Sequence, residues 1–553
     1  MLLTGAQILI KTLIEQGVDT VFGYPGGTVI NIYDELYKNS DKIHHYTTSH
    51  EQGASHAADG YARVTGKTGV VIATSGPGAT NLVTGIANAY LDSTPMVAIT
   101  GNVATNMLGR DSFQEVDISG VTMPITKHNY LVKDITKLAE TIRDAFALAM
   151  EGRPGPVLVD ITKDVQTGKT EYEPSPASAA GTPPEISTMQ LNDAAQLIRE
   201  AKRPYIYCGG GVIASNASEA LMAFADQIDA PVGLSIMGLT AVPYAHPRYL
   251  GMVGMHGRYG ATKALYESDL LIAVGTRFSD RATGNKVEFM RDRKVLQIDI
   301  DPAEIGKNIG VTSCVIGDVK GVLSALNALL PQLEHKDWME RIQYMKEHPD
   351  NNLEMNPMRL TPQSVIEGAC RKNGDNVVAT DVGQHQMWTT QYYQFKKPRT
   401  FVTSGGLGAM GFGMGAAIGA SIGAGFKRTI LFTSDGSFHM NLSELATAVT
   451  NKLPLIIIVL NNRVLGMVRQ WQTLFFDGRY SNTTLERQTD FVKLAEAFGA
   501  VGLRAETNAE YEKCLEEAFG YDTPVLIDCT IDSDERVLPM IPPGGSINDI
   551  ILR

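Results

Sequence analysis

Short runs of aliphatic and β-branched residues alternate with segments of helical spacing along most of the chain. Each run ends at a turn rich in glycine, serine or aspartate. Such runs are typical of strands buried on both faces, and their alternation with helices favours parallel α/β sheets. The predicted strands are residues 19–23, 45–49, 69–74, 96–100, 156–160, 205–207, 270–274, 294–299, 377–380, 429–432, 455–460 and 525–527, and helical spacing covers residues 2–16 and 437–449.

Two segments of different composition divide this pattern into blocks. Residues 164–190 contain four prolines, and residues 333–358 are polar with few aliphatic side chains, as is typical of linkers. A length of 553 residues predicts three or four domains at about 150 residues each. We therefore expect three α/β domains, each a doubly wound parallel sheet. Their ranges are 1–163, 191–335 and 361–553, with linkers at 164–190 and 336–360.

The composition limits the possible partners. A net charge of −12 gives the chain no overall attraction to nucleic acids or anionic lipids. The five cysteines form no Cys-x-x-Cys pair and no signal peptide is evident, so we expect a cytoplasmic protein without a disulfide framework. Residues 405–426 carry no charge but hold nine glycines and few large aliphatic residues, so we expect no membrane span.

The strongest chemical signal lies in the third block. Asp435 and Gly436 follow a predicted strand, and Asn462 follows the next strand along the chain. Because parallel strands end at the same edge of a sheet, we expect the carboxylate and the amide to lie close together. Such oxygen ligands suit Mg²⁺ that also binds diphosphate oxygens. The alternative interpretation is an Asx turn and an ordinary loop asparagine pair.

This pattern resembles the motif of thiamine-diphosphate enzymes, with Ser434 in place of the usual first glycine. Across nearly the whole chain, further strings resemble the acetohydroxyacid synthase (acetolactate synthase) catalytic-subunit family. These strings are 21–27 (VFGYPGG), 50–54 (HEQGA), 75–81 (SGPGATN), 112–115 (SFQE), 152–157 (GRPGPV), 254–257 (GMHG), 277–281 (RFSDR) and 466–471 (GMVRQW).

The resemblance implies a cofactor site in the third domain. Asp435, Asn462 and the backbone carbonyl of Val464 would bind Mg²⁺. Met410 would hold the thiamine rings in a bent shape, although a core methionine would look the same. The other residues implied to contact thiamine diphosphate are Gly383, Gln384, His385, Gln386, Gly408, Gly436, Ser437, Gly466 and Met467.

In the first domain, Glu51 begins a predicted helix, where an acidic residue is common for electrostatic reasons alone. The resemblance implies a catalytic role, in which Glu51 hydrogen-bonds the thiamine pyrimidine bound by another subunit. The protein would then be a homodimer or homotetramer with shared active sites. Phe113, Gln114 and Lys163 would line the site across the interface. The glycines at 411, 415, 419 and 423 would form one face of a buried helix near that interface.

The middle domain carries a glycine-rich loop that is weak evidence by itself for a nucleotide. Its polar residues fall near strand ends, where turn chemistry is the alternative to ligand binding. The resemblance implies bound FAD. Its implied contacts are Arg153, Gly209, Gly210, Gly211, Met255, His256, Gly275, Arg277, Asp280, Arg281, Asp299, Ile300, Asp318 and Val319.

Carboxylate recognition is needed if the substrates are 2-keto acids. The resemblance assigns Arg281 to the carboxylate of the second keto acid, and Trp471 and Met467 to its side chain. A surface arginine and a core tryptophan are the alternatives. The C-terminal residues 537–553 are interpreted either as a lid over the site or as a disordered tail.

The implied reaction is decarboxylation of pyruvate and ligation of the remaining two-carbon unit to pyruvate or 2-ketobutyrate, in branched-chain amino-acid biosynthesis. A small regulatory subunit is an implied partner. The competing interpretations are pyruvate oxidase, glyoxylate carboligase, a catabolic acetolactate synthase and a non-catalytic nucleotide-binding module. Glu51 argues against glyoxylate carboligase, and Arg277 with Arg281 against the catabolic enzyme.

Overall fold

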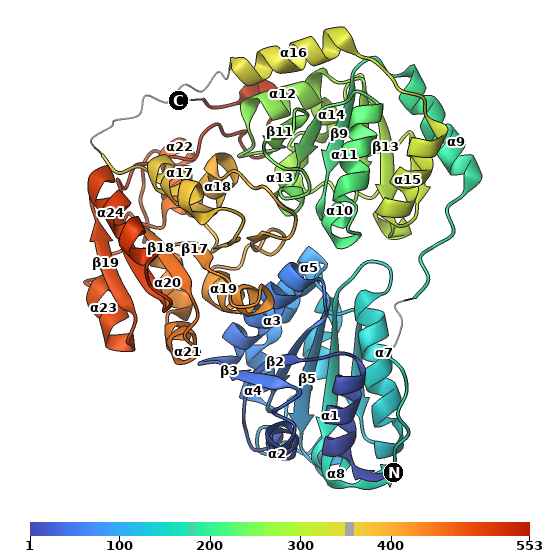
Figure 1. Cartoon of the computed structure of the whole chain (residues 1–553), viewed down its shortest axis with the longest axis vertical. Coiled ribbons are helices and arrows are strands. Elements are labelled where there is room, and N and C mark those ends of the chain that lie inside the picture. The colour runs from blue at the N-terminus through green and yellow to red at the C-terminus, as the bar shows by residue number, and fades with distance from the viewer. Residues whose placement is uncertain (178–180, 349–358, 553) are drawn as a thin grey trace.

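The computed structural model describes residues 1–177, 181–348 and 359–552; the predicted-linker residues 178–180 and 349–358, and Arg553, lie outside it. Within the described residues, each third of the chain forms a six-stranded sheet flanked by helices (Figure 1). All neighbouring strands in these sheets run parallel. The predicted α/β fold class is confirmed.

The first sheet has the strand order β3-β2-β4-β5-β7-β6. Its strands are β2 (Thr20–Tyr24), β3 (His44–Thr47), β4 (Gly69–Ala73), β5 (Met96–Asn102), β6 (His128–Val132) and β7 (Pro156–Thr162). The accompanying helices are α1 (Gly5–Glu15), α2 (Ile30–Lys38), α3 (Glu51–Thr65), α4 (Pro77–Asn81), α5 (Val83–Asp92), α6 (Ile118–Thr122), α7 (Leu138–Met150) and α8 (Lys163–Thr167).

The middle sheet has the order β11-β10-β9-β12-β13-β14. Its strands are β9 (Pro204–Cys208), β10 (Val232–Leu234), β11 (Tyr249–Met252), β12 (Leu270–Val274), β13 (Lys294–Asp299) and β14 (Ser313–Ile316). Its helices are α9 (Thr188–Glu200), α10 (Gly210–Ala214), α11 (Ser218–Gln227), α12 (Tyr259–Glu267), α13 (Asp280–Thr283), α14 (Lys286–Met290), α15 (Val319–Leu329) and α16 (Lys336–Glu347).

The third sheet has the order β16-β15-β17-β18-β20-β19. Its strands are β15 (Val377–Thr380), β16 (Phe401–Val402), β17 (Thr429–Ser434), β18 (Leu455–Asn461), β19 (Val501–Ala505) and β20 (Val525–Thr530). Its helices are α17 (Pro362–Asn373), α18 (Gln384–Tyr392), α19 (Phe412–Gly423), α20 (Asp435–Asn441), α21 (Glu444–Thr450), α22 (Gly466–Phe475), α23 (Phe491–Phe498) and α24 (Asn508–Ala518).

Several predicted boundaries are wrong. Leu2–Thr4 is not helical but forms strand β1, which pairs antiparallel with β8 (Lys169–Glu171) inside the first predicted linker. The second predicted linker contains α16, whose Trp338, Ile342 and Met345 are buried against the middle domain. The predicted helix over 437–449 is two helices, α20 and α21, with a break between Asn441 and Glu444.

Helix α19 forms from the uncharged, glycine-rich stretch, and it packs against α3 of the same chain (Figure 1). The two backbones meet without intervening side chains: a Cβ atom on Gly419 would lie 1.8 Å from the carbonyl oxygen of Ala57, and one on Gly60 2.2 Å from that of Ala416. The glycine face therefore joins the first and third domains within one chain. No helix in the described residues is long and apolar enough to cross a membrane.

We expect Gly419→Ala to lower the free energy of unfolding by about 3 kcal/mol or more, because the methyl group would overlap a backbone that cannot move alone. Gly310→Ala is the control, since nothing lies within 4 Å of a Cβ atom there. Its effect should stay within about 0.5 kcal/mol. Chemical denaturation monitored by circular dichroism measures both, and equal stability of the two variants would contradict the close packing.

Candidate active site

The predicted metal ligands lie at neighbouring strand ends. Asp435 directly follows β17 and Asn462 directly follows β18, and these strands pair with Ser434 opposite Leu460. Asn462 Oδ1 accepts a hydrogen bond from the Val464 N–H (3.2 Å), whereas buried Asp435 Oδ1 has no hydrogen-bond partner in the described structure. Burial raises the pKa of Asp435 to about 6. A buried carboxylate oxygen without a partner is costly, so this site fits a cation.

The predicted diphosphate loop lies at the end of β15, beside these ligands. Gly383 has φ +150°, a conformation that side chains rarely adopt, and Gln384 begins α18. Gln384 Oε1 accepts a hydrogen bond from Asn462 Nδ2 (3.4 Å). A Cβ atom on Gly466 would lie 1.9 Å from the same oxygen. The fold thus brings Gly383, Gln384, Asn462 and Gly466 together, as predicted.

Two other side chains of this loop are buried, and they differ in their hydrogen bonds. His385 Nε2 has no hydrogen-bond partner among the described residues, and burial lowers the pKa of His385 to about 3, so the ring is neutral. Gln386 Nε2 donates to Thr403 Oγ1 (2.7 Å) and to the Ser404 carbonyl (3.0 Å). The first turn of α18 therefore offers backbone N–H groups, rather than positive side chains, to an anion.

The serine that departs from the family motif has a structural role. Ser434 Oγ accepts the Ser437 N–H (3.3 Å) and so caps α20. Ser437 Oγ in turn donates to the Val382 carbonyl (2.9 Å). Val464 is buried and pairs with Thr484 in an isolated bridge. The substitution leaves both predicted side-chain metal ligands in place.

Glu51 is the first residue of α3 and points to the β4–α4 turn of its own domain. Its Oε2 accepts a hydrogen bond from Asn81 Nδ2 (2.9 Å), its sole hydrogen-bond partner within the described residues. The preceding N–H groups of Ser49 and His50 donate to Glu444 of the third domain (3.1 and 3.0 Å). The start of α3 is therefore fixed against α21 of the same chain.

The other predicted first-domain residues lie at the same sheet edge as Glu51. Gln114 packs its backbone against the β4–α4 turn, where a Cβ atom on Gly76 would lie 2.8 Å from the Gln114 carbonyl oxygen. Phe113 is 86% exposed. The Lys163 side chain is exposed at the end of β7 and makes no hydrogen bond or ion pair in the part of the chain described. Within one chain, Phe113 and Lys163 are therefore exposed at this edge.

The predicted flavin residues gather at one edge of the middle sheet, because β9, β12, β13 and β14 are neighbours there. Asp299 ends β13, and burial raises its pKa to about 6. Arg277 is half-buried and its guanidinium makes no hydrogen bond among the described residues, which fits an anionic ligand. Arg153 reaches this domain from the first one and pairs with Glu304 (2.8 Å).

Four other residues predicted to contact the flavin, three glycines and Asp318, also have structural roles in the fold itself. A Cβ atom on Gly209 would lie 2.1 Å from the Gly275 carbonyl oxygen, and one on Gly211 2.7 Å from the Gly275 Cα. These glycines therefore pack on each other. Asp318 caps α15 by accepting the Gly321 N–H (3.2 Å) and binds Ser215 Oγ (2.6 Å). Val319 and Ile300 flank these turns. None of these contacts excludes a ligand beside them.

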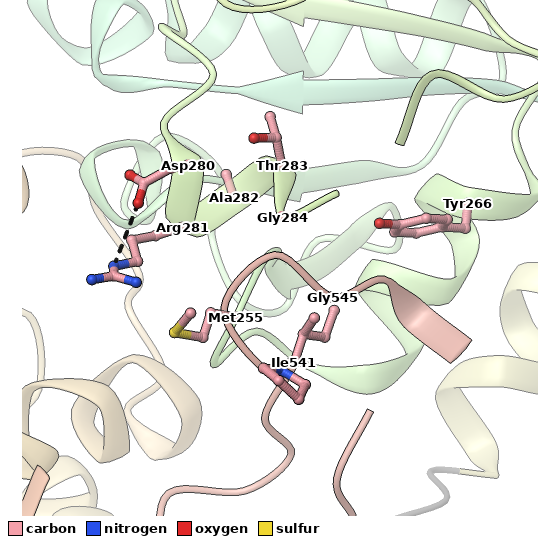
Figure 2. Close-up of a pocket in the computed structure, with 10 residues that line it drawn as sticks. Met255, Tyr266, Asp280, Arg281, Ala282, Thr283, Gly284, Ile541 and Gly545 are labelled. Carbon is pink, nitrogen blue, oxygen red and sulfur yellow. Dashed lines mark ion pairs between the residues drawn. The ribbon is translucent and has the colours of Figure 1, made fainter. Parts of the chain in front are cut away.

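The predicted substrate residues come from two domains and meet. The guanidinium of Arg281 lies 5.6 Å from the centre of the Trp471 ring, in a cation–π arrangement. Arg281 is exposed and pairs loosely with Asp280 (3.9 Å; Figure 2). Gly408 and Met410 precede α19, and Met467 lies in the first turn of α22, one turn before Trp471.

The C-terminal segment is not a disordered tail, and it contacts residues of the site. The Ile541 N–H donates to the Met255 carbonyl (2.8 Å), and the Asn285 N–H donates to the Gly545 carbonyl (2.8 Å). Met255, Ile541 and Gly545 line a small pocket together with Arg281 (Figure 2). Burial lowers the pKa of neighbouring His256 to about 4, and its Nδ1 has no partner within the described residues.

Family models match all three domains of the chain. Models of the N-terminal, central and C-terminal domains of thiamine pyrophosphate enzymes match residues 3–121, 191–326 and 381–529. The chain is 46% identical to a probable acetolactate synthase large subunit of Methanocaldococcus jannaschii, covering 99% of this chain and 95% of the relative. It is 47% identical to the acetolactate synthase large subunit of Corynebacterium glutamicum (99% and 90%), and 42% identical to the isozyme 3 large subunit of Escherichia coli (100% and 99%).

The chain belongs to the acetolactate synthase large-subunit family. Its first and third domains match the N-terminal and C-terminal cofactor-binding domain models of thiamine pyrophosphate enzymes. It is therefore a thiamine-diphosphate-dependent enzyme, and the family that the sequence motifs predict is confirmed.

Two residues that support the site of this acetolactate synthase family member, Asp381 and Gln470, were not predicted from the sequence. Asp381 is buried at the end of β15 and accepts the N–H groups of Val382 (2.9 Å) and Gly411 (2.8 Å). Gln470 Oε1 accepts from Gln384 Nε2 (3.0 Å) and from the Val537 N–H (2.8 Å). The signal for Asp381 is present in the sequence, since it is an acid directly after a buried strand and two residues before Gly383.

Proposed function

We propose that this chain is the catalytic subunit of an acetohydroxyacid synthase. It would decarboxylate pyruvate and ligate the two-carbon unit to pyruvate or 2-ketobutyrate, giving 2-acetolactate or 2-aceto-2-hydroxybutyrate. The observation that carries the cofactor assignment is the buried Asp435 Oδ1, which lies beside Asn462 at adjacent strand ends and has no hydrogen-bond partner over the described ranges. Full-length similarity to acetolactate synthase large subunits supports the reaction.

The third domain would hold the cofactor through Mg²⁺. Asp435 Oδ1, Asn462 Oδ1 and the Val464 carbonyl would be its protein ligands, and the N–H groups at the start of α18 would face the diphosphate. Gly408 and Met410 would contact the thiamine rings. When bound, thiamine diphosphate supplies a thiazolium that accepts the electron pair released on decarboxylation.

Glu51 would act on the pyrimidine ring of the cofactor. A carboxylate hydrogen-bonded to a ring nitrogen can move a proton to and from it by general acid–base catalysis. Asn81 holds one carboxylate oxygen and leaves Oε1 free to face the ring. The exposure of Phe113 and Lys163, at the same sheet edge as Glu51 and Gln114, supports a homodimer or homotetramer in which a second chain completes the site.

FAD would bind at the middle-domain edge in a structural role, because the ligation involves no net oxidation. Half-buried Arg277 offers its guanidinium to the diphosphate of FAD, Asp299 suits a ribose hydroxyl, and His256 Nδ1 is available for a hydrogen bond. Asp280, Met255 and the glycines of this edge would line the same ligand. We also propose a cytoplasmic location and a small regulatory subunit, since the relatives are named large subunits.

An activity assay tests the proposed reaction. The purified protein would receive pyruvate, thiamine diphosphate and Mg²⁺, with and without FAD, and acetolactate would be measured. Acetolactate formation without oxygen consumption is expected. Acetate or peroxide in place of acetolactate would instead identify a pyruvate oxidase.

Acceptor choice would depend on the Arg281–Trp471 pair. Trp471→Leu should lower the preference for 2-ketobutyrate over pyruvate by about tenfold, since a pocket distinguishes one methylene by roughly 10- to 200-fold at most. Competition between the two acceptors, read as the product ratio, measures this.

Phe475→Leu provides a matched control for that variant. Phe475 lies on the same helix, with its ring centre 5.8 Å from that of Trp471, and it is 39% exposed. Among the described residues, Arg281 makes a cation–π contact with Trp471 and none with Phe475. An unchanged product ratio in Trp471→Leu would remove Trp471 from acceptor recognition.

A further inference from the structure

The loop that leads into α19 is held by the first domain of its own chain. This loop, residues 403–411, carries Gly408 and Met410, the residues proposed to contact the thiamine rings. The carboxylate of Asp92, at the end of α5, accepts the N–H groups of Gly405 (3.0 Å) and Gly406 (2.6 Å). The Asp92 side chain is fully buried. A negative charge thus fixes two successive backbone groups of a glycine-rich segment.

Arg63 of α3 completes this contact. Its Nη2 pairs with Asp92 Oδ2 (2.8 Å), its Nε pairs with Asp59, and its Nη1 donates to the Thr403 carbonyl (2.9 Å). The Arg63 side chain is only 9% exposed. The two buried acids therefore share one buried cation, which also binds the start of the loop.

A second attachment lies next to the first. Ser404 Oγ donates to Asn88 Oδ1 of α5 (2.5 Å) and accepts the Ala409 N–H (3.0 Å). Asn88 Nδ2 donates in turn to Asp59 Oδ2 (2.8 Å). The turn of the loop is therefore closed on itself by Ser404 and tied to the first domain by Asn88.

The far end of the loop is held by the third domain. There Asp381 accepts the Gly411 N–H (2.8 Å). The loop contains Gly405, Gly406 and Gly408, and glycine loses the most conformational freedom on ordering. An anchor at each end would supply that ordering before the cofactor binds, and preorganisation of this kind increases affinity.

We propose that Asp92 is a positioning residue for thiamine diphosphate, acting through the loop 403–411 of its own chain. This inference rests on the proposed function. The first domain would then contribute through Glu51 at the start of α3 and, independently, through Asp92 and Arg63 near the ends of α5 and α3. Asp92 itself would not touch the cofactor.

The test is the dissociation constant of thiamine diphosphate, measured by calorimetry on the full chain at saturating Mg²⁺. Asp92→Asn keeps the shape of the side chain but places an amide against the Arg63 guanidinium or the loop N–H groups. We expect its dissociation constant to rise about tenfold, as loss of one charged hydrogen bond predicts. Ser404→Ala, which removes the second attachment at a smaller steric change, should raise it in the same direction.

Asp160→Asn is the matched control. Asp160 is also a buried first-domain acid, and it binds Thr100 Oγ1 (2.7 Å) and Asn102, away from the loop. It should lower the melting temperature without changing cofactor affinity. If Asp92→Asn and Ser404→Ala lower the melting temperature but bind thiamine diphosphate as the unmodified chain does, Asp92 has only a structural role and the proposal is wrong.

Different results would contradict the proposed function and the proposed role of Asp92. If the unmodified chain does not bind thiamine diphosphate, the proposed function is wrong. If the unmodified chain binds it and forms acetolactate, but both loop variants bind it equally well, only the role of Asp92 is refuted.

Discussion

Replacing Glu51 with glutamine is expected to lower kcat for acetolactate formation by about 10²- to 10⁴-fold, the usual contribution of a general acid–base group. Glutamine can still accept the hydrogen bond from Asn81 Nδ2 at 2.9 Å, so the position of the side chain should be kept. It cannot exchange a proton with the pyrimidine ring. Steady-state acetolactate production gives kcat, and calorimetry should give a nearly unchanged affinity for thiamine diphosphate.

Glu35→Gln is a suitable control because Glu35 is a buried glutamate of the same domain that pairs with Lys38 (2.8 Å), away from the site. Its kcat should match that of the unmodified chain. Undiminished turnover in Glu51→Gln would refute the catalytic role, and loss of cofactor binding would show that Glu51 serves binding instead.

Replacing Asp435 with asparagine should weaken Mg²⁺ binding by at least about 100-fold. Changes in residues that only support a metal ligand lower the metal affinity by about 10- to 100-fold, and loss of the charged ligand itself should lower it further. Thiamine diphosphate binding should fail at Mg²⁺ concentrations that saturate the unmodified chain, and activity should fall with it. Titration of activity and of cofactor binding with Mg²⁺ measures the effect.

The same variant should not harm the fold. Asp435 Oδ1 has no hydrogen-bond partner among the residues that the structure describes, and burial raises the pKa of Asp435 to about 6. Removing the charge therefore relieves a desolvation cost. We therefore expect the melting temperature without Mg²⁺ to be equal to or above that of the unmodified chain. A large drop in melting temperature, with Mg²⁺ affinity intact, would assign Asp435 a structural role.

The strand pattern was predicted best in aliphatic runs of four to six residues that are almost wholly buried. Leu270–Val274, Lys294–Asp299 and Val377–Thr380 have the predicted bounds. Strands that depend on pairing rather than on their own pattern were missed, such as the two-residue β16. Leu2–Thr4 fits a helical period, but its backbone pairs with β8, which lies far away in the sequence. Local periodicity carries no information about such partners.

Helix α16 was missed for a related reason. Its buried residues, Trp338, Ile342 and Met345, have helical spacing but are too few to outweigh the polar residues around them. The composition of the segment therefore resembles a linker. Only the packing of these three side chains against the middle domain reveals the helix.

The residues of the site also differ in whether the sequence alone could reveal them. Asp435, Asn462 and Gly383 could be found from sequence because each follows a buried strand, and parallel strands end together. Asp92 and Arg63 could not, since each lies within an ordinary amphipathic helix and meets loop 403–411 only through the folded arrangement of two domains. Gln470 was hidden similarly, because its buried amide contacts segments before and after it in the chain.

The backbone contact between α3 and α19 also restricts how this enzyme can vary. Where two helices touch through side chains, a change on one can be compensated by a smaller residue on the other. Gly419 and Gly60 have no side chain that could be made smaller, and their neighbours are backbone carbonyl oxygens, which every amino acid carries. We therefore expect chimaeric chains to fold only when both parents keep glycine at positions 60 and 419.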